Sequence, residues 1–203
     1  MIPSLIPTGH FCAIIFDCDG TLADTLEVHF EAWAAALRTL DIEMTRSWYF
    51  ERSGLSAAEM IEELETVHAR TVRGATFMDA RRQCYRRMTP NIRAIDSVVD
   101  IARAYAQRVP MAVASGGDRA MVEPTLAGLQ LLPLFKAVVT VDEVQRGKPS
   151  PELFLLAAQR LNVAPENCLV YEDSSEGLEA ARRANMRSID VRRCVRPGER
   201  SCA

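Results

Sequence analysis

The feature that most constrains the fold is a series of short apolar runs, each long enough for a buried strand and too short for a helix. Five such runs occur along the 203 residues: Ala13–Phe16, Met111–Ala114, Ala137–Val141, Cys168–Tyr171 and Ser188–Val191. Helix-like segments separate the later four runs. Strands that alternate with helices form parallel sheets with right-handed crossovers. The sequence therefore predicts an α/β fold with a Rossmann-like parallel sheet.

The stretch from residue 26 to residue 91, the helical insert, interrupts this alternation. It contains no convincing strand, and an apolar stripe at helical spacing runs through Leu26, Phe30, Trp33, Leu37 and Leu40. Ser56–Glu59 has the pattern of a capping box at a helix start. We therefore predict an α/β core formed by residues 1–25 and 92–203, and an all-helical second domain formed by residues 26–91.

Polar residues follow four of the predicted strands, at the strand end or in the next loop. They are Asp17-Cys18-Asp19-Gly20-Thr21, Ser115-Gly116-Gly117, Gly147-Lys148-Pro149 and Glu172-Asp173-Ser174. In an open parallel sheet, ligands bind beyond the carboxyl ends of the strands. We therefore expect these four loops to converge on one pocket.

Four carboxylates would meet in that pocket, those of Asp17, Asp19, Glu172 and Asp173. Without a counter-charge they would repel one another, and some would have to take up protons. Oxygen ligands without histidine or cysteine favour Mg²⁺. We therefore predict a magnesium site formed by these four residues, where the ion neutralises phosphate oxygens and holds the phosphoryl group for in-line attack. For Glu172, direct binding of the ion and support of the other ligands are both open interpretations.

The spacing of the first two carboxylates suggests their chemistry. Asp17 is the candidate nucleophile, because a well-placed carboxylate accepts a phosphoryl group to give an acyl phosphate that water hydrolyses. Asp19 lies two residues further on, where it is expected to protonate the departing alkoxide and later to deprotonate the attacking water.

The remaining polar residues suit phosphate binding. The Ser115 hydroxyl and the backbone N–H groups of Gly116 and Gly117 are expected to hold phosphate oxygens at the start of a helix. Lys148 is expected to place a fixed positive charge beside the nucleophile and the phosphate.

Taken in order, these motifs resemble those of the haloacid dehalogenase superfamily of phosphotransferases. Its first motif corresponds to Phe16–Leu22, its second to Ser115, its third to Lys148–Glu152 and its fourth to Glu172–Ser174. The resemblance extends over almost the whole chain, and the helical insert matches the mobile cap that the family carries between its first two motifs. It implies a Rossmann-like core with an inserted α-helical cap, and Mg²⁺-dependent chemistry through an aspartyl-phosphate.

A closer resemblance is to the β-phosphoglucomutase-like phosphatases, in which Asp24-Thr25 followed by His29-Phe30-x-x-Trp33 is typical. The segment from residue 110 to residue 191 is similar to bacterial fructose-1-phosphate phosphatases. This resemblance implies a small sugar phosphate, such as fructose 1-phosphate, as substrate. His29, Trp33 and Ser56 are the candidate substrate-lining residues of the insert, although Trp33 equally suits the insert's own core.

Arg81 stands in a polar run of the insert that ends near Tyr85. Contact with a substrate phosphate is one interpretation of this arginine. A solvated helix face is the interpretation that we favour, since charge runs usually face water.

Two departures from the mutases of this branch favour hydrolysis. Those enzymes usually carry a lysine and a polar partner just after the second-motif serine, whereas this chain has Gly116–Asp118 there. An arginine expected after the cap loop is also missing, because Gly54-Leu55-Ser56 is followed by Ala57. Both absences weaken the binding of a second phosphate.

The sequence thus predicts a phosphoric monoester hydrolase. A β-phosphoglucomutase, which is an isomerase, is the main alternative, since it shares Asp17 and Asp19. A dehalogenase lacks the second carboxylate, and Asp19 argues against it. A non-catalytic protein that binds sugar phosphates or a partner would not need the intact pair of aspartates.

The bulk composition restricts the partners. A formal net charge of -3 gives no general attraction to nucleic acid or to an anionic membrane. The apolar run Phe11–Phe16 is too short to span a bilayer, and no basic segment precedes it as in a signal peptide. Six cysteines without a Cys-x-x-Cys pair indicate reduced thiols in the cytoplasm. We expect a small phosphorylated metabolite as the ligand, and a monomer or small homo-oligomer.

Overall fold

The computed structural model describes residues 5–52, 55–72 and 74–193. Their central feature is a five-stranded sheet in the order β5-β4-β1-β6-β7. The strands are β1 (Ala13–Phe16), β4 (Met111–Ser115), β5 (Ala137–Thr140), β6 (Cys168–Glu172) and β7 (Arg187–Asp190). All four pairings are parallel. The predicted α/β fold is confirmed, and the predicted runs match these strands to within one residue at each end.

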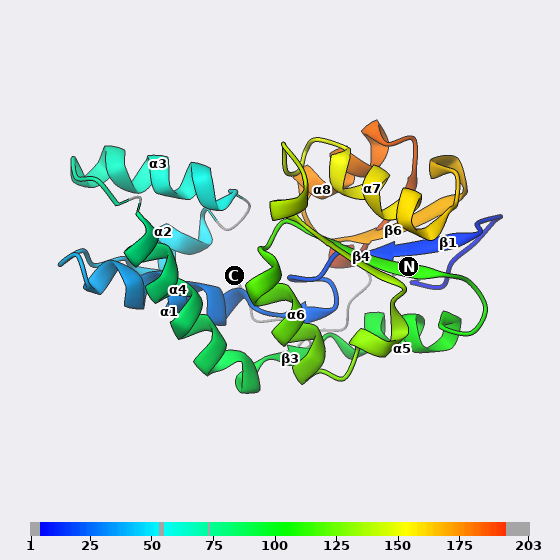
Figure 1. Ribbon diagram of the computed structural model, residues 1–203, viewed down its shortest axis with the longest axis horizontal. Helices are drawn as coiled ribbons and strands as arrows, with labels where there is room; N and C mark the ends of the chain where they lie inside the picture. The colour runs from blue at the N-terminus through cyan, green and yellow to red at the C-terminus, as the bar shows by residue number, and fades with distance from the viewer. Residues whose placement is uncertain (1–4, 53–54, 73, 194–203) are drawn as a thin grey trace.

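Helices cover both faces of the sheet, which explains why the central strands are apolar up to their carboxyl ends, where β4 closes with Ser115 and β6 with Glu172. Every residue of β1, β4 and β6 is buried. On one face Ile15 packs with α7 (Glu152–Leu161) and α8 (Ser175–Arg183). On the other face Ile14 packs with α5 (Asp96–Tyr105) and α6 (Arg119–Gly128). Figure 1 shows these two helical layers on opposite sides of the strands.

The helical insert lies to one side of the sheet (Figure 1). It contains α1 (Leu26–Arg38), α2 (Arg46–Phe50), α3 (Ala57–His68) and α4 (Ala75–Met88). These helices enclose an apolar cluster of their own, which includes Phe30, Trp33, Leu37, Tyr49, Met60, Leu64 and Phe77. The predicted capping box is present, because the Ser56 side chain accepts from the Glu59 N–H and the Glu59 carboxylate accepts from the Ser56 N–H.

The chain passes between sheet and insert through a small antiparallel ladder that the sequence did not predict. Strand β2 (Ala23–Asp24) pairs with β3 (Arg93–Ala94) where the chain enters and leaves the insert. Two residues are too few to produce a recognisable alternating pattern. A second apolar cluster joins the insert to the core, with Ala32 and Tyr85 on one side and Met121 on the other. The domain boundaries at residues 25/26 and 91/92 remain a prediction.

Short 3₁₀ helices complete the described chain: η1 (Thr89–Asn91), η2 (Leu132–Leu134), η3 (Val141–Glu143), η4 (Pro165–Asn167) and η5 (Val191–Arg193). Within the described residues, no helix combines the length and the apolar character needed to cross a membrane. The described cysteines Cys12, Cys18, Cys84 and Cys168 are free thiols. Cys194 and Cys202 lie outside the described residues.

Glu143 in η3 stabilises the packing of two helices, because it accepts hydrogen bonds from Arg119 of α6 and Arg160 of α7. Desolvation alone would raise the pKa of this carboxyl group. The hydrogen bonds from Arg160, the Thr140 N–H and Arg119, with the charge of Arg119, outweigh it and lower the pKa to about 2. A lowered folded-state pKa means stability that is present above the unfolded value near 4.5 and is lost as the pH falls toward 2.

We therefore expect Glu143→Gln to reduce the free energy of unfolding by about 1 kcal/mol at neutral pH. The difference from wild type should shrink as the pH falls from 4.5 toward 2, because the wild-type carboxylate is itself becoming protonated. Urea unfolding at pH 7 and pH 3 measures both values. An equal difference at the two pH values would contradict this explanation.

Candidate active site

Asp17 is the first residue after β1, and its backbone N–H donates to the Tyr171 carbonyl of β6 over 2.9 Å. Its side chain lies against Lys148, whose Nζ is 2.5 Å from Asp17 Oδ1 and 2.6 Å from Glu172 Oε2. All three side chains are buried or nearly so. The structure therefore brings together three polar clusters that are far apart in the sequence.

The charges at this point do not balance. Burial raises the pKa of Asp17 well above its usual range, the Glu172 charge adds to the rise, and Lys148 opposes it. Burial would lower the pKa of Lys148, but its ion pairs with Asp17 and Glu172 raise it. Asp173 adds a third carboxylate beside the one lysine. A divalent cation would remove the excess negative charge and keep Asp17 ionised.

Three of the four predicted metal ligands lie in position for such an ion. One carboxylate oxygen from each of Asp17, Glu172 and Asp173 lies within 4.8 Å of the other two. This set of hard oxygen donors suits Mg²⁺. Glu172 also has other partners, since its Oε1 accepts from the N–H groups of Asp173 and Ser174 and from the Ser174 hydroxyl. Its side chain therefore fixes Lys148 and the β6 loop whether or not it binds the ion directly.

The Asp19 carboxylate does not belong to that oxygen cluster and contacts other side chains. Its Oδ1 lies 2.8 Å from Thr25 Oγ1 and 3.1 Å from His29 Nε2, and its Oδ2 lies 3.3 Å from Ser115 Oγ. Gly20, with φ of 78°, allows the tight turn that follows. The role of Asp19 as a metal ligand stays a prediction.

These contacts also set the protonation of Asp19. Burial would raise its pKa, but the charge and hydrogen bond of His29, with the bonds from Thr25 and Ser115, lower it. Asp19 is thereby held as a carboxylate, which is the form that a general base requires.

The predicted phosphate-binding loop follows β4 directly. Ser115 is fully buried, and its hydroxyl accepts from the Gly117 N–H over 3.0 Å. Both Gly116 and Gly117 line the pocket. A Cβ on Gly117 would lie 3.0 Å from Val122 and 3.3 Å from Asp19, so the backbone packs closely against the site there. The loop leads into α6, whose first N–H groups carry positive partial charge.

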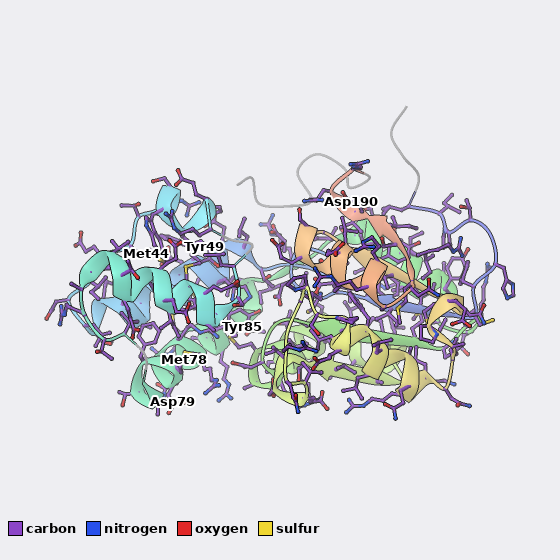
Figure 2. All side chains as sticks on the ribbon, turned by 90° about the horizontal axis from the view of Figure 1, so that it is seen from above. Met44, Tyr49, Met78, Asp79, Tyr85 and Asp190 are labelled. Carbon is purple, nitrogen blue, oxygen red and sulfur yellow. The ribbon has the colours of Figure 1, made fainter. Side chains whose placement is uncertain are left out.

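A cavity of about 460 Å³ lies between these loops and the helical insert. His29, Trp33 and Ser56, the three residues of the insert predicted to face the substrate, all line it. Figure 2 shows Tyr49 and Met78 among the helices of the insert and Tyr85 where the insert meets the sheet. Tyr85 joins the two parts, because its ring packs on His29 and its hydroxyl is 2.9 Å from Thr125 Oγ1 of α6.

Arg81 requires a correction, because the favoured solvated face is wrong. Arg81 is only 5% exposed, and its guanidinium carbon lies 4.8 Å from the centre of the Trp33 ring. The buried residues of α4 are Phe77, Arg81 and Tyr85, spaced four apart on one helical face. The four-residue spacing can be seen in the sequence, but the charged residues next to Arg81 favoured the interpretation of a solvated helix face.

Gly177 is a second residue whose role the sequence analysis missed. A Cβ there would lie 2.0 Å from the carboxyl carbon of Glu172, closer than any packed atom can approach. Glu172 occupies the space that any larger residue would fill. The available signal was the position of Gly177 in the sequence, three residues after the Glu172–Ser174 motif and near the start of a helix.

We expect Gly177→Ala to weaken Mg²⁺ activation about 10- to 100-fold, as changes beside metal ligands do. Alanine is the better helix former, so lost helix propensity cannot cause the defect. The measurement is the Mg²⁺ concentration needed for half-maximal phosphate release. Gly74→Ala is the control, since a Cβ on Gly74 meets nothing within 4 Å. Wild-type Mg²⁺ dependence in Gly177→Ala would refute this role.

Comparison with known proteins identifies the class that this fold and site define. The family model of haloacid dehalogenase-like hydrolases matches residues 12–185. The chain therefore belongs to this family, and its named relatives support a phosphatase.

Among the relatives, the chain is 33% identical to fructose-1-phosphate phosphatase YqaB of Escherichia coli, over 90% of this chain and 97% of that protein. It is 30% identical to a phosphorylated carbohydrates phosphatase of Thermotoga maritima, over 87% and 83% of the two chains. It is 29% identical to β-phosphoglucomutase of Bacillus subtilis, over 88% and 82%. The structure of CbbY from Rhodobacter sphaeroides in complex with phosphate is similar, with a TM-score of 0.80, 26% identity and coverage of 89% and 85%.

Proposed function

We propose that this phosphatase hydrolyses a small sugar phosphate, such as fructose 1-phosphate, with Mg²⁺ and through an aspartyl-phosphate on Asp17. The observation that carries the proposal is the buried contact of Asp17 with Lys148, beside Glu172 and Asp173. The similarity to a fructose-1-phosphate phosphatase supports the substrate class.

In the first half-reaction, an Asp17 oxygen attacks phosphorus and the bond from phosphorus to the sugar oxygen breaks. The departing oxygen takes a proton from Asp19, which His29 and Thr25 hold in place. Because Asp19 is a carboxylate in the free site, it first takes up that proton from a substrate that binds as its monoanion. Lys148 offsets the negative charge of the nucleophile, and the Ser115–Gly117 loop orients the phosphoryl oxygens. Mg²⁺ held by Asp17, Glu172 and Asp173 would supply charge neutralisation for the transferring group.

In the second half-reaction, Asp19 takes a proton from water, and the water oxygen attacks phosphorus. The bond from phosphorus to the Asp17 oxygen breaks, so that inorganic phosphate leaves and the carboxylate is restored. We propose that residues 26–91 act as a cap domain on the core of residues 1–25 and 92–203. The cap would exclude bulk water and contribute His29, Trp33 and Ser56 to the substrate site.

A β-phosphoglucomutase is the second candidate, because the B. subtilis mutase is 29% identical. A mutase must hold a second phosphate while the intermediate turns round. The glycines and aspartate at 116–118, with Ala57 after the cap loop, give that phosphate no cation. Hydrolysis is therefore the function that we favour.

We further propose a cytoplasmic protein, a monomer or small homo-oligomer, whose ligand is a small phosphorylated metabolite and not nucleic acid or a membrane. The scattered spacing of the cysteines and the net charge of -3 support this setting.

We expect purified protein to release phosphate from a panel of sugar phosphates when Mg²⁺ is present. Activity should fall to background with a chelator and return when Mg²⁺ is added in excess, because the carboxylate cluster is unbalanced without it. The assay measures free phosphate. When β-glucose 1-phosphate is the substrate, the formation of glucose 6-phosphate is measured as well. Glucose 6-phosphate formed without free phosphate would favour the mutase, and no reaction across the panel would exclude both.

We expect Asp17→Asn to lower turnover by about 10³-fold or more, as loss of a catalytic nucleophile does. When the wild-type reaction with a substrate radiolabelled in its phosphate group is quenched with acid, the protein should retain the label as an acyl phosphate, which base removes. The variant should retain no label. Asp100→Asn, on the outer face of α5, should behave like the wild type in both assays. A label retained in Asp17→Asn would place the intermediate elsewhere.

A further inference from the structure

One end of the pocket is formed by α4 and the start of α6. It contains a cluster of charged side chains that takes no part in the reaction at Asp17. Asp118 precedes α6 directly, lines the pocket, and has a side chain that is 13% exposed. Its Oδ2 lies 3.1 Å from Arg82 Nε and 3.7 Å from Arg81 Nη2. A carboxylate of the core therefore faces two arginines of the insert.

Arg81 alone would be a strong anchor for a second anionic group, since a buried guanidinium binds phosphate well. Asp118 cancels that attraction, because its charge lies beside both arginines. The outer pair of Arg82 with Asp79 balances the other cation. The pocket end therefore carries little net positive charge that could attract a phosphate dianion.

The pair is also incomplete. Among the described residues, Asp118 Oδ1 and Arg81 Nε are buried side-chain atoms with no hydrogen-bond partner. Buried polar atoms are costly unless they are paired. These two atoms are enclosed, so a ligand in the pocket reaches the pair through its remaining, partly exposed atoms. A sugar hydroxyl both donates and accepts, so it can serve a carboxylate and a guanidinium together there, whereas a phosphate dianion only accepts.

We propose that Asp118 is a specificity-determining residue: it neutralises Arg81 and Arg82, so that the pocket takes the hydroxyl-bearing end of a sugar monophosphate and rejects a second phosphate. This inference rests on the proposed phosphatase function and adds to it the discrimination between monophosphates and bisphosphates.

The test compares kcat/KM for fructose 1-phosphate and fructose 1,6-bisphosphate in the wild type, in Asp118→Asn and in Asp118→Ser. Serine also removes the charge and still suits a helix N-terminus. If one variant misfolds, the other still tests the loss of the charge. We expect the wild type to prefer the monophosphate. Both variants should shift the ratio toward the bisphosphate about tenfold, which corresponds to about 1.4 kcal/mol.

Two further variants identify the cause. Adding Arg81→Met to Asp118→Asn should remove the gain for the bisphosphate, because the freed guanidinium is lost. Asp100→Asn is the control, since it removes a carboxylate at an exposed position of α5 that lies outside the pocket and touches neither Arg81 nor Arg82. Its ratio should equal that of the wild type.

The outcomes separate the two proposals. An unchanged ratio in both Asp118 variants, or an equal loss for both substrates, would overturn the specificity role while leaving the phosphatase intact. A gain that survives the Arg81→Met change would also overturn it. If the wild type released no phosphate from any monophosphate, the proposed function would fall, and the inference with it.

Discussion

The site depends on one buried cation. Lys148 lies between Asp17 and Glu172, with less than a tenth of its side chain exposed. Removing one member of such a group leaves a buried charge without compensation, which costs about 3–5 kcal/mol. The positions of the other groups follow from this contact. Glu172 is held by Ser174 and the backbone after β6, and Gly177 leaves the space that its carboxylate occupies.

The strand order explains how residues so far apart in the chain reach this lysine. Strand β1 lies between β4 and β6. The chain runs from β1 to β4 and β5 on one side, and then returns past β1 to β6 and β7 on the other side. A crevice forms at such a point, beyond the carboxyl ends of the strands. Asp17, Ser115 and Glu172 stand at the ends of these three neighbouring strands. The sheet topology thus brings the three site residues together, and the short loops after the strands only orient their side chains.

Features that depend on local pattern could be predicted from the sequence. The five strands are short apolar runs, and the capping box at Ser56 is a local signal of four residues. The grouping of Asp17, Lys148 and Glu172 followed from the rule for parallel sheets. The β2–β3 ladder could not be predicted in this way, because its pairing joins residues about 70 positions apart through two-residue strands.

The buried arginine shows a different limit. Arg81 stands in a run of charged residues that suits a solvated helix, yet the helix turns it inward against Trp33. Burial of this cation is tolerated because Asp118 and an aromatic face approach it from other segments. Such compensation depends on tertiary contacts and leaves no trace in the local pattern of α4.

The same compensation connects specificity to the position of the insert. Arg81 and Arg82 belong to α4, whereas Asp118 belongs to the core, so their charges cancel only when the two parts are together. Moving the insert away would separate the arginines from the carboxylate and expose both signs to solvent. On the proposal that residues 26–91 act as a cap, discrimination against a second phosphate would be a property of the closed pocket. An open pocket would admit many phosphorylated molecules, and selection would fall on the step that brings α4 back to α6.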